Sequence, residues 1–263
     1  MTPRAAFAAA AASARERVRY PGELLGSAAF LAILVFALGR VWLAVERAGR
    51  MPEGWSVSSL VLYLVVAEVV IMAPGAIHLR VASDVRSGDL AVQLLRPMSW
   101  VAWELARALG GAAARVAFLA TVGVTLAWAL HGLPRLDAPS VIVGALVLVP
   151  AAILMETTVR LALGVLAFWT EDANAFAWIW SKLCLVLGGV LMPIELYPPW
   201  LQAIARVLPF EAELRGPARA IARGDVTEAW AAGARLLAWL VLVTIGLILL
   251  HSRASRSVQL NGG

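Results

Sequence analysis

Long apolar stretches alternate with short segments that hold most of the charged residues, and this pattern predicts membrane-spanning helices. A spanning α-helix needs about 20 predominantly apolar residues. Six stretches satisfy that length: residues 24–45, 57–79, 103–130, 141–168, 176–196 and 230–250. The expected fold is therefore all-α, a polytopic membrane protein with one transmembrane domain over residues 1–263.

Three segments outside these stretches have patterns of their own. Residues 1–22 are rich in alanine and arginine, which predicts an amphipathic helix on the cytoplasmic membrane surface. Residues 80–100 are too polar to span and predict a short helix, a turn and a proline stop. Residues 197–227 contain several prolines and predict two short re-entrant helices on the outer side, before the last span.

Composition agrees with a membrane protein and excludes a soluble one. Hydrophobic residues make up 61% of the chain and charged residues 15%, with a mean hydropathy of +0.82. The formal net charge is +5, and the arginines lie between apolar stretches, where they would meet anionic lipid head groups. We expect contact with membrane lipids and no nucleic-acid binding, because no basic stripe with interleaved aromatic residues occurs.

Lysine and arginine are more frequent in the segments that fall on the side of the termini. This bias predicts that both termini are cytoplasmic. Four arginines are exceptions to this bias, because they lie in the long outer connection: Arg206, Arg215, Arg219 and Arg223.

Four ionisable residues fall inside apolar stretches, namely Glu68, Arg115, Glu156 and Arg160. Charges at the bilayer centre are costly, so such residues face the protein interior or water. Glu156 and Arg160 are four residues apart on one helix face, which favours a structural ion pair over a role in lining or gating a pathway. Glu68 is a possible partner for Arg115 on another helix.

The chain has no motif for a catalytic site. Its single lysine, Lys182, is not part of a phosphate-binding GxxxxGK[ST] loop. The three histidines lie on different segments, so we expect neither a metal site nor catalytic residues. Cys184 lies in an apolar stretch and is expected to be an inert packing residue.

The most specific local pattern is SDVRSGDLAVQLLRPMSW at residues 83–100. Its leucines can face the membrane or a partner's groove, while Asp84, Arg86 and Asp89 stay in water. Such a helix, held between two spans, is a suitable contact for a partner protein.

Three segments carry a resemblance to a known family: DVRSGDLAVQLLRPMS at 84–99, LAFWTEDANAF at 166–176 and GGVLMPIELYPPWLQAIARVLPF at 188–210. They resemble the permeases of ABC exporters of the second type (ABC-2), in the bacterial branch with an IRSGDL…LLRP segment. The first fifty residues match only in general character.

The resemblance implies a permease of the bacterial inner membrane with six spans. It also implies two separate ATPase subunits, which hold the ATP and Mg, and a second permease copy or a related permease chain. The ATPase would contact the basic N-terminal helix and a coupling region that contains Asp84, Arg86, Ser87, Gly88, Asp89, Leu90, Leu94, Leu95 and Arg96. The outer gate would contain Pro193, Tyr197, Pro198, Pro199 and Trp200.

Two other classes of function remain open at this point. One is an ion-coupled carrier or channel that uses Glu68 and the Glu156–Arg160 pair. The other is a membrane enzyme that acts on lipids or peptides. The transported substrate, its direction and the pairing of permeases are left open by the sequence.

Overall fold

The computed structural model describes residues 3–19, 21–94, 99–170, 173–224 and 226–261, and every regular element in these ranges is helical. The helices, with π and 3-10 segments marked η, are α1 (Pro3–Arg19), α2 (Pro21–Arg47), α3 (Val57–Met72), α4 (Ile77–Ser87), α5 (Asp89–Leu94), α6 (Trp100–His131), α7 (Ala138–Val143), η1 (Gly144–Leu148), α8 (Val149–Val165), η2 (Leu166–Phe168), α9 (Ala173–Leu187), η3 (Ile194–Leu196), α10 (Pro199–Val207), η4 (Glu211–Arg215), α11 (Gly216–Arg223) and α12 (Val226–Asn261).

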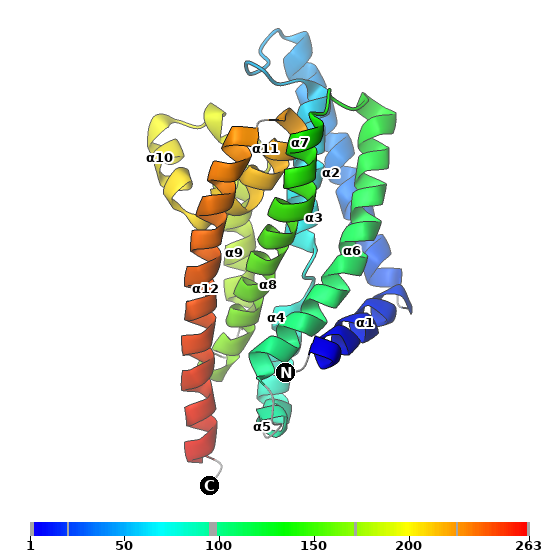
Figure 1. Cartoon of the computed structure of the whole chain (residues 1–263). Coiled ribbons are helices and arrows are strands. Elements are labelled where there is room, and N and C mark those ends of the chain that lie inside the picture. The colour runs from blue at the N-terminus through cyan, green and yellow to red at the C-terminus, as the bar shows by residue number, and fades with distance from the viewer. Residues whose placement is uncertain (1–2, 20, 95–98, 171–172, 225, 262–263) are drawn as a thin grey trace.

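The helices form an up-and-down bundle with α1, α5 and the end of α12 together at one end (Figure 1). We call this the terminal end and the other the distal end. Within the described residues, five helices are long and apolar enough to cross a membrane: Pro21–Arg47, Val57–Ser87, Trp100–His131, Ala138–Phe168 and Val226–Arg256. The chain is thus an all-α polytopic protein, as the apolar pattern predicts.

The expected span 176–196 corresponds to α9, which has only 15 residues and ends at Leu187. At 1.5 Å per residue it is about 22 Å long, less than the roughly 30 Å of a bilayer core. The chain then turns at Gly188 and Gly189 and folds back as η3, α10, η4 and α11 near the distal end (Figure 1). These short helices occupy the connection for which the sequence predicts re-entrant helices.

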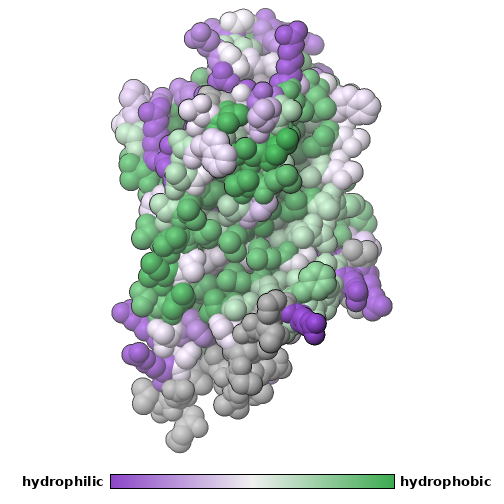
Figure 2. All heavy atoms as spheres, in the orientation of Figure 1, coloured by the Kyte–Doolittle hydropathy of each residue, from purple (hydrophilic) through white to green (hydrophobic). Residues whose placement is uncertain are grey.

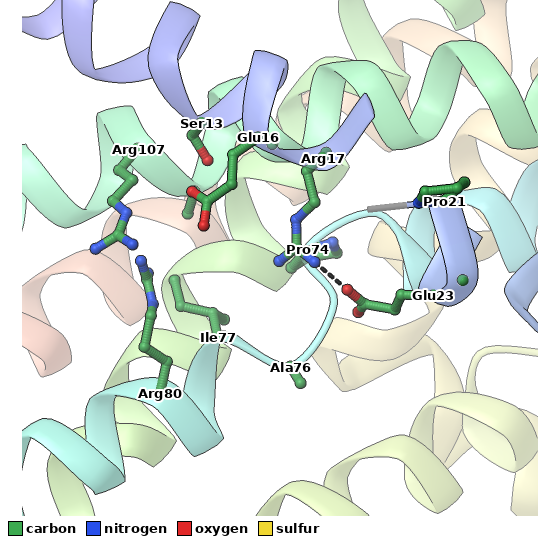
Figure 3. Close-up of a pocket in the computed structure, with 13 residues that line it drawn as sticks. Ser13, Glu16, Arg17, Pro21, Glu23, Pro74, Ala76, Ile77, Arg80 and Arg107 are labelled. Atoms are coloured by element: carbon green, nitrogen blue, oxygen red, sulfur yellow. Dashed lines mark hydrogen bonds and ion pairs between the residues drawn. The ribbon is translucent and has the colours of Figure 1, made fainter. Parts of the chain in front are cut away.

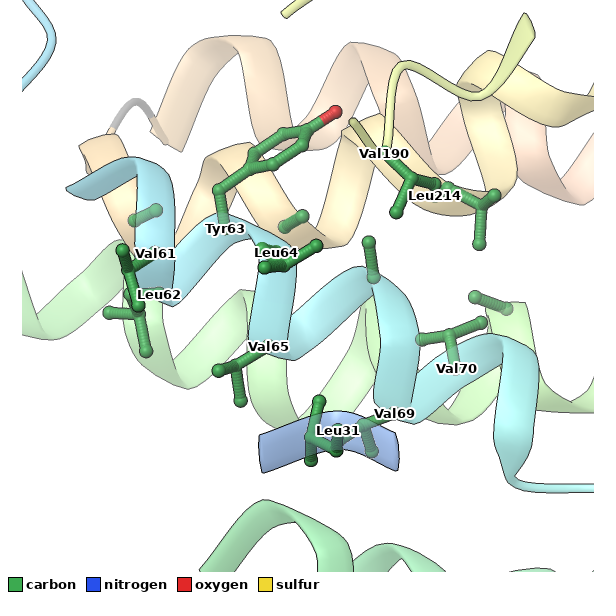
Figure 4. Close-up of a cluster of buried hydrophobic side chains, with 14 of the residues drawn as sticks. Leu31, Val61, Leu62, Tyr63, Leu64, Val65, Val69, Val70, Val190 and Leu214 are labelled. Carbon is green, nitrogen blue, oxygen red and sulfur yellow. The ribbon is translucent and has the colours of Figure 1, made fainter. Parts of the chain in front are cut away.

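Helix α3 is the centre of the bundle. Its sequence VSSLVLYLVVAEVVIM is apolar on every face, and most of its residues are buried. Tyr63 points towards Val190, while Val65 and Val69 lie on the opposite side, beside Leu31 of α2 (Figure 4). A helix that is apolar all round is stable only when other apolar groups surround it.

Hydrophobic residues also dominate the outside of the bundle. Figure 2 shows them gathered across the middle of one face, with hydrophilic residues towards both ends. Large apolar side chains of α2, α9 and α12 are exposed, among them Phe36, Trp178 and Leu242. Such a surface suits contact with lipid acyl chains, not water.

Pro74 separates α3 from α4 at the terminal half of the bundle. Helix α3 ends at Met72, and α4 begins at Ile77. Proline has no N–H group and obstructs a preceding helical turn, so the break follows from the sequence. Helix α4 then extends to Ser87, beyond the expected end of the span at residue 79.

Helix α1 packs across α6 at the terminal end, where a close approach depends on Gly110. A Cβ atom at this position would lie 2.1 Å from the carbonyl oxygen of Ala10. Gly110 therefore permits a close contact between two helices of the same chain.

Candidate functional site

A cavity of about 520 Å³ opens between α2, α3 and α9, beside the break at Pro74. We call it the α2–α9 cavity. Its ionisable and polar lining includes Glu68, Arg115, Arg160, Ser181 and Lys182. It therefore brings together Glu68, Arg115 and Arg160, three of the four intramembrane residues that the sequence singles out, and adds Lys182.

Two arginines at this cavity bind the open end of α3. The last carbonyl groups of a helix have no partner within it and carry partial negative charge. Arg160 Nη2 donates to the Ile71 carbonyl oxygen at 3.4 Å, and Arg115 Nη1 donates to that of Met72 at 3.4 Å. The break at Pro74 thus creates carbonyl acceptors that hold both guanidinium groups.

Each arginine also has a carboxylate partner. Arg160 Nε lies 2.6 Å from Glu156 Oε1, as the spacing of four residues predicts. Arg115 Nη2 lies 2.6 Å from Glu23 Oε1, so its partner is Glu23 and not Glu68. The pairing with Glu68 is wrong because the start of α2 packs against this part of α6, which a single sequence does not reveal.

Glu68 and Lys182 have no such carboxylate or guanidinium partner in the described part of the chain. Glu68 is only 4% exposed and lines the cavity, yet it makes no hydrogen bond or ion pair with a described residue. The Lys182 ammonium lies 5.2 Å from the centre of the Trp178 ring, a cation–π contact. These two ionisable groups remain available to a ligand in the cavity.

Glu156 also belongs to a second ionisable cluster, with Glu213 and Cys184. Oxygen atoms of Glu156 and Glu213 and the sulfur of Cys184 lie within 4.8 Å of one another, and all three residues are buried. Glu156 already accepts hydrogen bonds from Arg160 Nε and from Trp180 Nε1 at 2.8 Å. Because two buried carboxylates share one cation, charge balance requires that one of them be protonated or that a second cation be bound. Sequence spacing gives no sign of this cluster, because its members lie on α8, α9 and η4.

Ion pairs join separate parts of the distal connection, the segment of short helices from η3 to α11 at residues 194–223. Glu195 Oε1 lies 2.6 Å from Arg215 Nη2 and 2.5 Å from Arg219 Nη1. Arg215 and Arg219 also contact Glu228 at 3.0 and 2.8 Å. Burial alone would raise the pKa of Glu195, but the hydrogen bond and charge of Arg215 outweigh it and lower that pKa. Two of the four arginines in this connection, Arg215 and Arg219, are therefore matched by nearby carboxylates. Arg206 donates instead to Gln202 Oε1, and Arg223 lies over the Trp55 ring.

The residues expected at an outer gate lie at the start of the same connection. Tyr197 donates from its hydroxyl to the Val186 carbonyl oxygen at 2.5 Å, which ties it to the end of α9. Pro198 and Pro199 begin α10, and Pro193 precedes η3. Trp200 is 65% exposed. The structure brings these residues together, while their role as a gate stays a prediction.

The expected coupling region forms the tip of the terminal end. Gly88 ends α4 with a φ of 79°, a conformation that favours glycine, and α5 follows immediately. Arg86, Ser87 and Asp89 are exposed, with Ser87 Oγ donating to Asp89 Oδ2 at 2.8 Å. Asp84 Oδ2 accepts from Gln93 Nε2 at 3.3 Å, which joins the two helices.

Leu90 departs from the expected pattern. It is 1% exposed and packs with Ile77, Val81 and Trp100, so it belongs to the chain's own core and not to a surface that faces a partner or the membrane. The reason is the turn at Gly88, which folds α5 back onto α4. Leu95 and Arg96 lie outside the described residues, as does the side chain of Leu94.

A second cavity, of about 560 Å³, lies between α1, α4 and α6 near the same end (Figure 3). Arg80 and Arg107 extend towards each other there, and both are close to Glu104 Oε atoms, at 2.6 and 3.9 Å. Glu23 lines both cavities and pairs with Arg17 of α1 as well as with Arg115. One carboxylate thus connects α1 to the α2–α9 cavity.

Comparison with known proteins identifies the family. Residues 27–262 match a family described as ABC-2 family transporter protein. No curated protein matches the sequence. The family match covers nearly the whole chain and agrees with a bundle of long apolar helices. This chain is a multi-pass membrane protein and belongs to the ABC-2 family of transporter proteins.

Proposed function

We propose that the chain is the permease subunit of an ABC exporter in the bacterial inner membrane, powered by two copies of a separate ATPase. A second permease, identical or related, would complete the transport path. The ABC-2 family match supports a transporter subunit, and this family works with an ABC ATPase.

The observation that carries the proposal is the exposed polar turn between α4 and α5. Arg86 and Asp89 are exposed there, at the end where both termini lie (Figure 1). The turn is attached through α4 to Pro74 and the α2–α9 cavity. Force applied to this turn would therefore reach the cavity through one short helix, with the terminal end in the cytoplasm.

Charge reversal at the turn tests this coupling. We expect Arg86→Glu and Asp89→Lys to leave the bundle folded but to reduce ATP-dependent transport by about tenfold or more, as loss of a charged interface contact of 1.4 kcal/mol or more would. The measurement is transport and ATPase activity of the complex that co-purifies with the permease in mild detergent.

Matched controls lie at the distal end. Arg50→Glu and Glu53→Lys change the same charges on exposed residues of the α2–α3 turn. These controls should retain transport. Normal assembly and transport in the Arg86 and Asp89 variants would overturn the proposal. Transport that survives ATP depletion but stops when the proton gradient collapses would instead indicate an ion-coupled carrier.

A further inference from the structure

The α2–α9 cavity contains two kinds of charge. Arg115 and Arg160 are matched, because each has a carboxylate partner at 2.6 Å and a carbonyl of α3 at 3.4 Å. Glu68 and Lys182 are unmatched by a charge of the opposite sign in the described chain. The lining therefore offers one acidic and one basic group for an occupant.

Because Glu68 is buried, its lack of an oppositely charged partner has an energetic cost. Glu68 is only 4% exposed, and it lies on α3, within the most buried of the five candidate spans in the described residues. An unpaired carboxyl group in such a place costs free energy unless a proton, water or ligand satisfies it. Lys182 lines the same cavity from α9, yet no ion pair joins it to Glu68. A molecule that bridges them must carry both signs of charge.

Part of the cavity wall is apolar. Phe30 of α2 and Leu185 of α9 line it, and the neighbouring outer faces of these helices expose Ile33, Phe36 and Ile179. An alkyl chain can lie along such faces while its polar group reaches the charged interior. The volume of about 520 Å³ is in the range of roughly 300–1,000 Å³ that is usual for small-molecule sites.

We propose that the α2–α9 cavity binds the head group of a zwitterionic amphipath, with its ammonium group at Glu68 and its phosphate or carboxylate at Lys182. Both contacts would be charge-assisted hydrogen bonds, which are the strong ones. A membrane phospholipid and a lipid-linked peptide both have this chemistry. The inference rests on the proposed transport function and names its substrate class.

Three probes with the same 14-carbon chain length test the proposal on the full-length permease in a maltoside detergent. Lysophosphatidylethanolamine carries both charges, lysophosphatidylglycerol only the negative one, and tetradecylamine only the positive one. Native mass spectrometry measures their dissociation constants. We expect the zwitterion to bind about tenfold or more tightly than either singly charged probe, since one such contact is worth about 1.4 kcal/mol or more.

Two variants assign the contacts. Glu68→Gln should abolish the advantage of the zwitterion over lysophosphatidylglycerol and leave binding of the latter intact, which also shows that the variant is folded. Lys182→Met should abolish the advantage over tetradecylamine. Glu46→Gln and Arg47→Met remove equivalent charges from exposed residues at the distal end of α2 and should bind like the wild type.

Equal affinity for lysophosphatidylethanolamine and lysophosphatidylglycerol would overturn the proposal, because it would show that only the anion is recognised. Unchanged binding in both cavity variants would overturn it too. These measurements need no ATPase, so their failure differs from a failure of the coupling experiment. A lipid and a lipid-linked peptide are then separated by which one co-purifies with the wild type and is lost from both variants.

Discussion

At the scale of residues, the buried charges are held by short, specific contacts. Arg115 and Arg160 each bind a carboxylate and a carbonyl oxygen at the end of α3. Charges so satisfied can stay in an apolar bundle. Glu213 is different, since it is fully buried beside Glu156 and finds no cation of its own among the described side chains. Its neutral, protonated form fits this place best.

Substitution of Glu213 tests that assignment. Glu213→Gln keeps the shape and the hydrogen-bonding capacity of a protonated acid, so we expect the free energy of unfolding to change by less than about 1 kcal/mol. Glu213→Ala leaves a cavity and should cost about 2 kcal/mol or more. Thermal unfolding of the purified proteins gives the comparison. Bound metal in stoichiometric amount in the wild type, lost from Glu213→Gln, would contradict a protonated Glu213 and indicate a metal site with Cys184.

At the scale of elements, the distal connection depends on ion pairs as well as on packing. Helix α9, as described from Ala173, is shorter than a bilayer core, and the connection that follows it is joined to α12 through Arg215, Arg219 and Glu228. Glu195 joins the same arginines from η3. The stability of these short helices should therefore respond to the ionisation of Glu195.

The direction in which pH changes the stability of the fold follows from the lowered pKa of Glu195. Because the pKa of Glu195 is lowered from its ordinary value of 4.5, its ion pairs stabilise the fold above that value and lose this effect as the pH falls through the lowered pKa. We expect the wild type to unfold at a higher temperature than Glu195→Gln at pH 7, with the difference shrinking below about pH 4.5. Glu53→Gln, an exposed control, should show no such trend. A difference independent of pH would refute the assignment.

At the scale of the whole molecule, one apolar helix forms the centre and polar groups lie at both ends. Helix α3 is surrounded by α2, α6, α8 and α11, while the outer helices present apolar faces (Figures 1 and 2). The bundle places α1, the α4–α5 turn and the end of α12 together at the terminal end. All three therefore share one side of the membrane.

Cysteine labelling in whole cells tests the orientation. With the terminal end in the cytoplasm, a membrane-impermeant maleimide should label Arg50→Cys in intact cells. Ser87→Cys should react only after the cells are opened. The native Cys184 is buried and should add little background. The reverse pattern would place the α4–α5 turn outside and remove its role as an ATPase contact.

Much of the helix arrangement was predictable, and so was one contact of the site. Apolar length predicts the long helices, and a spacing of four predicts the Glu156–Arg160 pair. These are local properties, in which neighbours along the chain determine geometry. The burial of Leu90 was not predictable, because its packing partners lie on α4 and α6.

The sequence by itself determined that this is a helical membrane protein with charged residues inside its spans. Only the tertiary structure decided that Arg115 pairs with Glu23, that Glu213 approaches Glu156, and that Glu68 and Lys182 share a cavity. The physical reason is that lipid is as apolar as a helix face, so hydrophobicity does not select which helices meet. Steric fit and the pairing of buried charges decide which helices pack against each other. Both can be seen only in the packed structure.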